Sequence, residues 1–86
     1  MKVVYSREFI RQAAELPSKI IGKLDSLLAT LAKNPFDPQL HVKHLKGELQ
    51  SMLSFRITRD WRVTFRFEEK VIIRILGVKN RKDIYR

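Results

Sequence analysis

Apolar and polar residues alternate with a period of two over one long stretch in the last third of the chain. From residue 55 to residue 67 the odd positions are apolar, interrupted by Arg59. These odd-numbered residues are Phe55, Ile57, Trp61, Val63, Phe65 and Phe67. A period of two is typical of strands with one face in the core and the other in water. The pattern predicts strands near Met52–Thr58 and Trp61–Phe67, and a further apolar run predicts a third strand at Val71–Val78.

The first forty residues show helical spacing instead. Lys2–Tyr5 is β-branched and aromatic, which predicts a short strand, and Ser6 is a favourable N-cap for the helix that follows. A break at Pro17 separates this helix from a second one, which ends at Asn34-Pro35. The apolar residues of the second helix are Ile20, Ile21, Leu24, Leu27, Leu28 and Leu31. Two helices joined at a proline are expected to form an antiparallel hairpin over one face of the sheet, and a basic linker, His41–Gln50, leads to the strands.

The alternation also constrains how the strands pair, because directly paired residues of antiparallel strands share a face. Keeping the apolar side chains on one face requires a three-residue loop or a bulge in the first hairpin. The expected pairs are Phe55–Phe65 and Ile57–Val63 in that hairpin, and Phe65–Ile73 and Arg66–Ile72 in the second. The third strand is then apolar on both faces, which predicts an interior position in the sheet.

The net charge of the chain indicates that this sheet binds an anionic partner. Eighteen Lys and Arg against nine acids give a formal net charge of +9. Residues 1–40 hold six basic and four acidic residues, a net of +2, so residues 41–86 hold the remaining +7. Such a field attracts nucleic acid, an acidic protein or an anionic membrane surface. We expect the first half to act as scaffold and the second half as working surface.

Composition also argues against several classes of protein. Eighty-six residues suffice for one domain, which we place over residues 1–86. There are no cysteines, so neither disulfides nor a thiolate metal site is expected. No apolar run is long enough to span a membrane and no signal peptide is recognisable, so we expect a cytoplasmic location. His41 and His44 lack the partners of a metal site and are better interpreted as surface histidines, so no metal or other cofactor is expected.

Arginine is well suited to phosphate because its planar guanidinium can donate two parallel hydrogen bonds. The alternation places Arg56 and Arg62 on one water-facing side of the sheet, with Arg66 further along. The acids nearby are expected in turns: Asp60, Glu68 and Glu69. Uncompensated arginines repel one another, and a phosphate between them relieves that repulsion. The alternative is an ordinary solvated strand face, on which Lys and Arg are common.

The last eight residues are basic and include a tyrosine. Tyr85 stands between basic residues, so its ring can stack on a base while its neighbours hold phosphate. Ile84 can anchor this tail to the rest of the domain. The alternative is a frayed terminus that adds only solubility.

Several short segments together resemble a known family. They are the Val-Val-Tyr-Ser strand and cap near the N-terminus, Asn34-Pro35-Phe36, Leu45-Lys46-Gly47, Phe55-Arg56-Ile57, Trp61-Arg62-Val63 and the C-terminal Arg81-Lys82-Asp83-Ile84-Tyr85-Arg86. Their order and spacing resemble the RelE/ParE superfamily of bacterial and archaeal type II toxins over essentially the whole chain. The resemblance implies an α+β fold with an N-terminal strand, a helical hairpin and an antiparallel three-stranded meander that forms a small curved sheet.

In the RelE branch, the resemblance implies an mRNA interferase, an endoribonuclease that enters the ribosomal A site, cuts mRNA without a metal and so inhibits translation. A 2′-OH attacks the adjacent phosphate, which requires a proton acceptor, a proton donor and positive charge at the phosphorane. The residues that match catalytic positions are Arg56, Arg62, Arg81 and Tyr85. By this match the arginines bind or stabilise phosphate, and the tyrosine stacks on the base or orients the substrate. The residues expected to bind RNA around them are Lys43, Lys46, Arg66, Lys79 and Lys82.

One position departs from the family pattern. Many members end in His-Arg-Lys-Asp-Val-Tyr, and here Asn80 stands in place of the histidine. Asparagine cannot accept the 2′ proton. Lys79 or Lys82 could serve if neighbouring arginines lower its pKa, or the site could work mainly by orientation and charge.

Two other functions fit the same resemblance. One is a ParE-like toxin that poisons DNA gyrase and cleaves nothing, and the other is a decayed basic module that only binds nucleic acid or its antitoxin. Arg62, Arg81 and Tyr85 favour the nuclease, whereas Asn80 slightly favours the gyrase poison. Every version implies an acidic cognate antitoxin as partner, and the nuclease adds the ribosome and mRNA.

Overall fold

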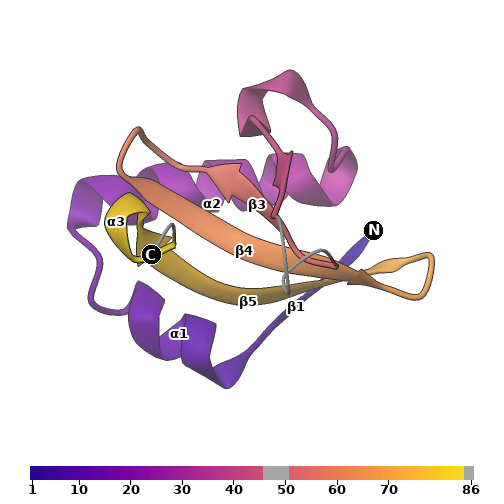
Figure 1. The fold of residues 1–86 in the computed structure, drawn as a ribbon, viewed down its shortest axis with the longest axis horizontal. Helices are drawn as coiled ribbons and strands as arrows, with labels where there is room; N and C mark the ends of the chain where they lie inside the picture. The colour runs from indigo at the N-terminus through magenta and orange to yellow at the C-terminus, as the bar shows by residue number, and fades with distance from the viewer. Residues whose placement is uncertain (46–50, 85–86) are drawn as a thin grey trace.

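The computed structural model spans residues 1–86 and describes all of them except 46–50 and 85–86 (Figure 1). Its strands form one sheet in the order β1-β5-β4-β3-β2. The strands are β1 (Lys2–Tyr5), β2 (Lys43–His44), β3 (Leu53–Arg56), β4 (Trp61–Glu68) and β5 (Ile72–Asn80). The helices are α1 (Arg7–Ala13), α2 (Ser18–Lys33), the 3-10 turn η1 (Pro38–Leu40) and α3 (Arg81–Ile84). β1 runs parallel to β5 and the other neighbours are antiparallel, so the predicted meander β3-β4-β5 is confirmed and gains a strand on either side.

The N-terminal elements begin where the sequence predicts, although α1 ends at Ala13, before the break expected at Pro17. The side chain of Ser6 caps α1, because its Oγ accepts a hydrogen bond of 3.0 Å from the Phe9 N–H. Pro17 directly precedes α2, and Asn34 follows its last residue. The buried residues of α2 are Leu24, Leu27 and Leu31, which form one stripe at helical spacing. Within the described part of the chain, neither this helix nor any other is long and apolar enough to cross a membrane.

One core cluster joins the helices to the apolar side chains on one face of the sheet. Its buried residues in β3, β4 and β5, together with Ile57 directly after β3, are Leu53, Phe55, Ile57, Val63, Phe65, Ile73, Ile75 and Val78. The rings of Phe55 and Phe65 pack with their centroids 6.0 Å apart, and Leu31 of α2 is fully buried in the same cluster. Figure 1 shows α2 running behind the sheet. The predicted separation of an apolar face over β3 and β4 is therefore confirmed.

The register of the first hairpin differs from the predicted one by two residues. The observed pairs are Leu53–Phe65, Ser54–Thr64, Phe55–Val63 and Arg56–Arg62, so the predicted pairs Phe55–Phe65 and Ile57–Val63 are wrong. The loop does have three residues, 58–60, and Ile57 donates its N–H to the carbonyl of Trp61 at 2.9 Å. Both registers keep the same face parity, so alternation could not distinguish them. The observed register keeps Trp61 on the strand, where it packs against the core.

The second hairpin shows the same kind of difference. The observed pairs include Phe65–Ile75, Arg66–Arg74, Phe67–Ile73 and Glu68–Ile72, so the predicted pairs Phe65–Ile73 and Arg66–Ile72 are wrong. The chain turns one residue later than predicted, with Glu69 in the left-handed conformation at φ 57°. Glu68 therefore ends β4 instead of lying in the turn. β5 lies between β1 and β4, which confirms its predicted interior position.

A β-bulge in β5 changes the register further along the same strand pair. The pairs on either side of it are Phe65–Ile75, Thr64–Gly77 and Val63–Val78, so Leu76 is the extra residue. Because of this extra residue, Ile75 before the bulge and Val78 after it both face the core. In an unbulged ladder Val78 would lie opposite Arg62, whereas the bulge places Lys79 there.

The segment predicted as a basic linker contains a strand. Lys43 and His44 form β2, which pairs with Ser54 and Leu53 at the edge of the sheet. His41, two residues earlier, has a left-handed backbone with φ 48° and ends η1. The short strand extends the sheet by one strand beyond β3.

Candidate functional site

Three cations lie side by side on neighbouring strands. Arg56 of β3 pairs directly with Arg62 of β4, and Arg62 pairs in turn with Lys79 of β5. Directly paired residues share a face of the sheet, so these three residues form a cation row across β3, β4 and β5. The predicted placement of Arg56 and Arg62 on one face is confirmed. Lys79 joins them because of the bulge.

Arg62 is not the water-facing residue that the alternation predicted, since only 4% of it is exposed. Its Nε donates to Ser54 Oγ at 3.0 Å, and its Nη2 donates to the carbonyl oxygen of His41 at 2.9 Å. The side chain thus crosses β3 and joins β4 to the segment before β2. A buried guanidinium is tolerated only when its N–H groups are hydrogen-bonded. Arg62 therefore acts as a buried crosslink as well as a charge.

A concave site at one end of the cation row is lined by cationic residues. It has a volume of about 370 Å³ and is formed by Lys43, Arg56, Arg59, Arg62 and Arg81. We call it the cation cavity. Lys43, Arg56, Arg59 and Arg81 make no ion pair with any residue that the structure describes. Like charges gathered without acids repel, and a bound polyanion would remove that repulsion.

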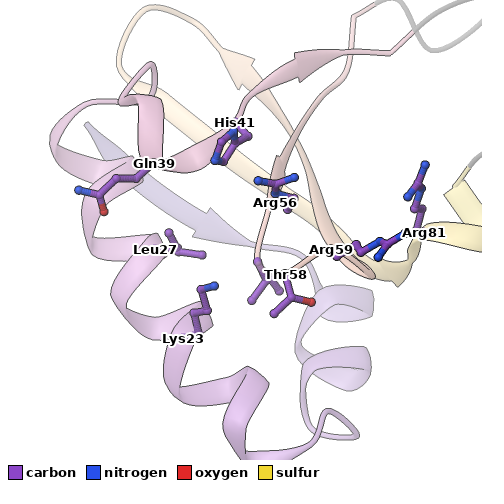
Figure 2. Close-up of a pocket in the computed structure, with 9 residues that line it drawn as sticks. Lys23, Leu27, Gln39, His41, Arg56, Thr58, Arg59 and Arg81 are labelled. Carbon is purple, nitrogen blue, oxygen red and sulfur yellow. The ribbon is translucent and has the colours of Figure 1, made fainter.

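A second concave site adjoins the first on the side of α2. It has a volume of about 490 Å³ and is lined by Lys23, Leu27, Gln39, His41, Arg56, Ile57, Thr58, Arg59 and Arg81. We call it the α2-side cavity. Arg56, Arg59 and Arg81 line both sites, so the two cavities lie next to each other. In Figure 2 these three arginines lie along the end of the β3–β4 hairpin, with Lys23 and Leu27 presented by α2.

The β3–β4 loop holds two of these arginines in place. The carbonyl oxygen of Asp60 accepts a hydrogen bond of 2.6 Å from the Arg81 N–H, which ties the start of α3 to the loop. Within the loop, the Asp60 N–H donates to Thr58 Oγ1 at 3.4 Å. Arg59 stands between these two anchored residues and is exposed. Its position beside Arg81 is therefore set by backbone contacts.

Arg66 lies apart from the two cavities and is compensated. Its Nη2 is 2.9 Å from Glu68 Oε1, and Arg74 on β5 contacts the same carboxylate oxygen. Hydrogen bonds from Arg74 and then Arg66 lower the pKa of Glu68 below its ordinary value. The premise that this stretch of arginines lacks acidic partners is thus wrong for Arg66, because Glu68 lies on the strand beside it.

The remaining predicted site residues are divided between several places. Lys79 and Asn80 contribute to a separate concavity of about 420 Å³ that includes Gln12 of α1. Lys82 is exposed, and its N–H donates to Asn80 Oδ1 at 3.2 Å. Asparagine at this position thereby accepts a hydrogen bond from the first turn of α3, which a side-chain oxygen of this length can reach.

Lys46 and Tyr85 lie outside the described residues. His41 lines the α2-side cavity, whereas His44 lies on the edge strand β2 and is exposed. Across the described ranges, no three or more acidic, histidine or cysteine side chains come together in a way that could hold a metal ion.

No family model matches this sequence, and no curated protein matches it. Solved structures do match. YafQ from E. coli superposes with a TM-score of 0.81 at 16% identity, over 99% of this chain and 98% of that chain. The YoeB/ParE toxin from Agrobacterium tumefaciens gives a TM-score of 0.78 at 19% identity, over 93% and 98% of the two chains. The toxin-antitoxin complex RelBE2 from Mycobacterium tuberculosis gives 0.77 at 23% identity, over 93% and 96%.

The chain has the RelE/ParE toxin fold. This confirms the fold predicted from the order of the short motifs, although fewer than one residue in four is identical in each of these pairs. Arg59 lines both cavities, but it was not among the site residues predicted from the sequence. The alternation had marked Arg59 only as an interruption, and that interruption was the available sign that the residue lies in a loop beside Arg56.

Proposed function

We propose that this chain is the toxin of a type II toxin-antitoxin pair and that it cuts mRNA on the ribosome. The observation that carries the proposal is the cation cavity, in which side chains from β2, β3, β4, α3 and the β3–β4 loop converge. Four of its five lining residues have no acidic partner in the described part of the chain. The RelE/ParE fold supports the same conclusion, since YoeB/ParE and RelBE2 are named as a toxin and a toxin-antitoxin complex.

In the proposed reaction the 2′-OH of one nucleotide attacks its own 3′ phosphate and expels the 5′ oxygen of the next nucleotide. The phosphorane carries more negative charge than the ground-state phosphate, so cations fixed around it stabilise the transition state. We assign this role to Arg56, Arg59 and Arg81, which are exposed and line the cation cavity. Arg62 holds β3, the strand that carries Arg56, in position through its hydrogen bond to Ser54. Its buried positive charge also stabilises the phosphorane, because Arg62 lines the cation cavity.

Proton transfer requires groups beyond these arginines. In this proposal one of Lys79 and Lys82 accepts the 2′ proton and the other gives a proton to the leaving 5′ oxygen, because Lys79 belongs to the cation row and Lys82 directly follows Arg81. Tyr85 stacks on the base and orients the substrate, as the motif match implies. Metal chemistry has no part in the proposed reaction, and the protein acts in the cytoplasm where its substrate is.

The proposed partner that restrains the toxin is an acidic antitoxin. A segment rich in Asp and Glu would be drawn to residues 41–86, which carry +7, and would cover the cation cavity. Binding of such a segment and binding of mRNA would then be mutually exclusive. An acidic reading frame adjacent to the gene is expected.

The decisive test is induction in bacteria with growth and mRNA cleavage measured together. Wild type should arrest growth and cut mRNA, whereas Arg56→Ala, Arg81→Ala and Tyr85→Ala should each lower cleavage, the arginine variants by about 10²-fold. Arg7→Ala provides a matched control, because Arg7 is an exposed arginine on α1 outside both cavities. Growth arrest with intact mRNA and trapped DNA gyrase would reject the nuclease and support a ParE-like poison.

A further inference from the structure

The α2-side cavity is not used by the reaction proposed above. It adjoins the cation cavity through Arg56, Arg59 and Arg81, but its other lining residues come from α2, from η1 and the residue after it, and from the start of the β3–β4 connection. Lys23 and Gln39, both exposed, are contributed by these outer walls. A ligand that fills the cation cavity and extends along the shared arginines must enter this second space.

The cavity combines three kinds of chemistry. Lys23 supplies a cation that has no ion-pair partner among the described residues. The buried side chains of Leu27 and Ile57 supply an apolar floor. Gln39 supplies an amide that can both donate and accept, and its side chain makes no hydrogen bond to the described part of the protein.

These groups match the parts of a nucleotide. A cation suits its phosphate, an apolar floor suits the face of its base, and a free amide suits the donor and acceptor atoms on the edge of the base. A volume of about 490 Å³ also falls in the range of small-ligand sites. The carboxylates of an acidic peptide would pair with the cations, but they would make no favourable contact with the apolar floor.

We infer that the α2-side cavity is a nucleotide subsite, which holds the residue of single-stranded RNA next to the scissile phosphate. Lys23 contacts the phosphate of that nucleotide, its base lies over Leu27, and Gln39 contacts the edge of the base. The RNA backbone then passes the shared arginines, which Figure 2 shows among the residues that line the α2-side cavity. This inference rests on the proposed function and extends it, because it gives the protein a means to prefer one neighbouring base.

Binding of short RNA to the purified full chain tests the subsite. The probes are fluorescently labelled tetranucleotides with 2′-O-methyl groups, which cannot be cleaved, in four versions that differ in one base. Lys23→Ala should weaken all four by roughly three- to tenfold and reduce the slope of log K against log salt by about 0.7. Gln39→Ala should leave that slope unchanged and reduce the differences among the four bases.

Lys19→Ala is the matched control, since Lys19 is an exposed lysine on the same helix that lines neither cavity. If Lys23→Ala behaves like Lys19→Ala while Arg81→Ala loses binding, the subsite is absent and the proposed nuclease stands. Lys23-dependent capture of a polyglutamate peptide, with RNA binding unaffected by Lys23→Ala, would assign the cavity to a protein partner and overturn the inference. Unchanged mRNA cleavage by Arg56→Ala and Arg81→Ala would instead reject the proposed function itself.

Discussion

Gln12 of α1 and Val78 of β5 are joined by a hydrogen bond of 2.9 Å, in which the Val78 N–H donates to Gln12 Oε1. The bond lies beside the bulge at Leu76, whose carbonyl oxygen accepts from Ser6 Oγ at 2.8 Å. A bulge leaves backbone groups without ladder partners, and here α1 and its cap supply them. The first helix thus fixes the register that brings Lys79 into the cation row.

We predict that Gln12→Ala destabilises the fold and disorganises the cation row. The Val78 N–H loses its acceptor, which should cost about 1–3 kcal/mol of unfolding free energy in urea. Hydrogen exchange at the Val78 and Lys79 amides should accelerate together. Gln12→Glu keeps an acceptor oxygen and should restore most of both properties. Glu8→Ala is the control, because it removes the hydrogen bond at the other end of the Gln12 amide and an exposed ion pair with Arg11, but leaves the acceptor of the Val78 N–H in place. An equal effect of Glu8→Ala would contradict the assignment.

Gly77 should be sensitive to substitution for a related reason. A Cβ at this position would lie 2.9 Å from Gln12 Oε1, which cannot retreat without losing its bond to Val78. Gly77→Ala is therefore expected to cost about 1–3 kcal/mol, and much of that cost should vanish in a Gln12→Ala background. A double-mutant cycle in urea measures this coupling, and strictly additive values would contradict it.

Gly22→Ala, whose added methyl meets nothing within 4 Å, should stabilise α2 by about 1 kcal/mol.

Alanine substitutions of Arg62 and Arg56 should differ in their effect on stability but not in their effect on mRNA cleavage. Arg62→Ala removes the donor to Ser54 Oγ and to the His41 carbonyl, so unfolding free energy should fall by roughly 2–4 kcal/mol. Arg56→Ala removes an exposed side chain and should change stability by no more than about 0.5 kcal/mol. Both variants should lose mRNA cleavage. If Arg62→Ala unfolded at the same urea concentration as Arg56→Ala, the crosslink would not be structural.

Much of the fold was predictable because it follows from local rules. Alternation separates the two faces of β3 and β4, a serine cap begins α1, and Pro17 and Asn34-Pro35 bound α2. The register was not predictable, because shifting a strand by two residues leaves every side chain on the same face. Packing of Trp61 and the position of each turn decide it, and both depend on the assembled core.

The sequence predicted a cationic site on one face of the sheet, but it did not predict which cations are buried or which residues join them. Arg56 and Arg62 do share a face. The burial of Arg62, however, depends on β2, which lies in the segment predicted as a basic linker, and on the carbonyl of His41. The place of Lys79 depends on a bulge held by Gln12, which is more than sixty residues away in sequence. Such long-range contacts leave no periodic pattern in the chain.

Glu68 gives the fold a pH dependence whose sign can be stated. The carboxylate is hydrogen-bonded by Arg74 and by Arg66, and these contacts lower its pKa from the ordinary 4.5. A carboxyl whose pKa is lower in the folded than in the unfolded chain stabilises the fold above the unfolded pKa. That contribution is lost as the pH falls through the folded pKa.

Comparison of wild type with Glu68→Gln in urea, as a function of pH, should therefore show a stability difference that is constant near neutral pH and shrinks below about pH 4.5. Arg74→Met should reduce the pH-dependent part more than Arg66→Met, because the hydrogen bond from Arg74 is the larger cause of the shift. A difference that grows as the solution becomes more acidic would show that the two arginines do not favour the ionised carboxylate in the folded chain.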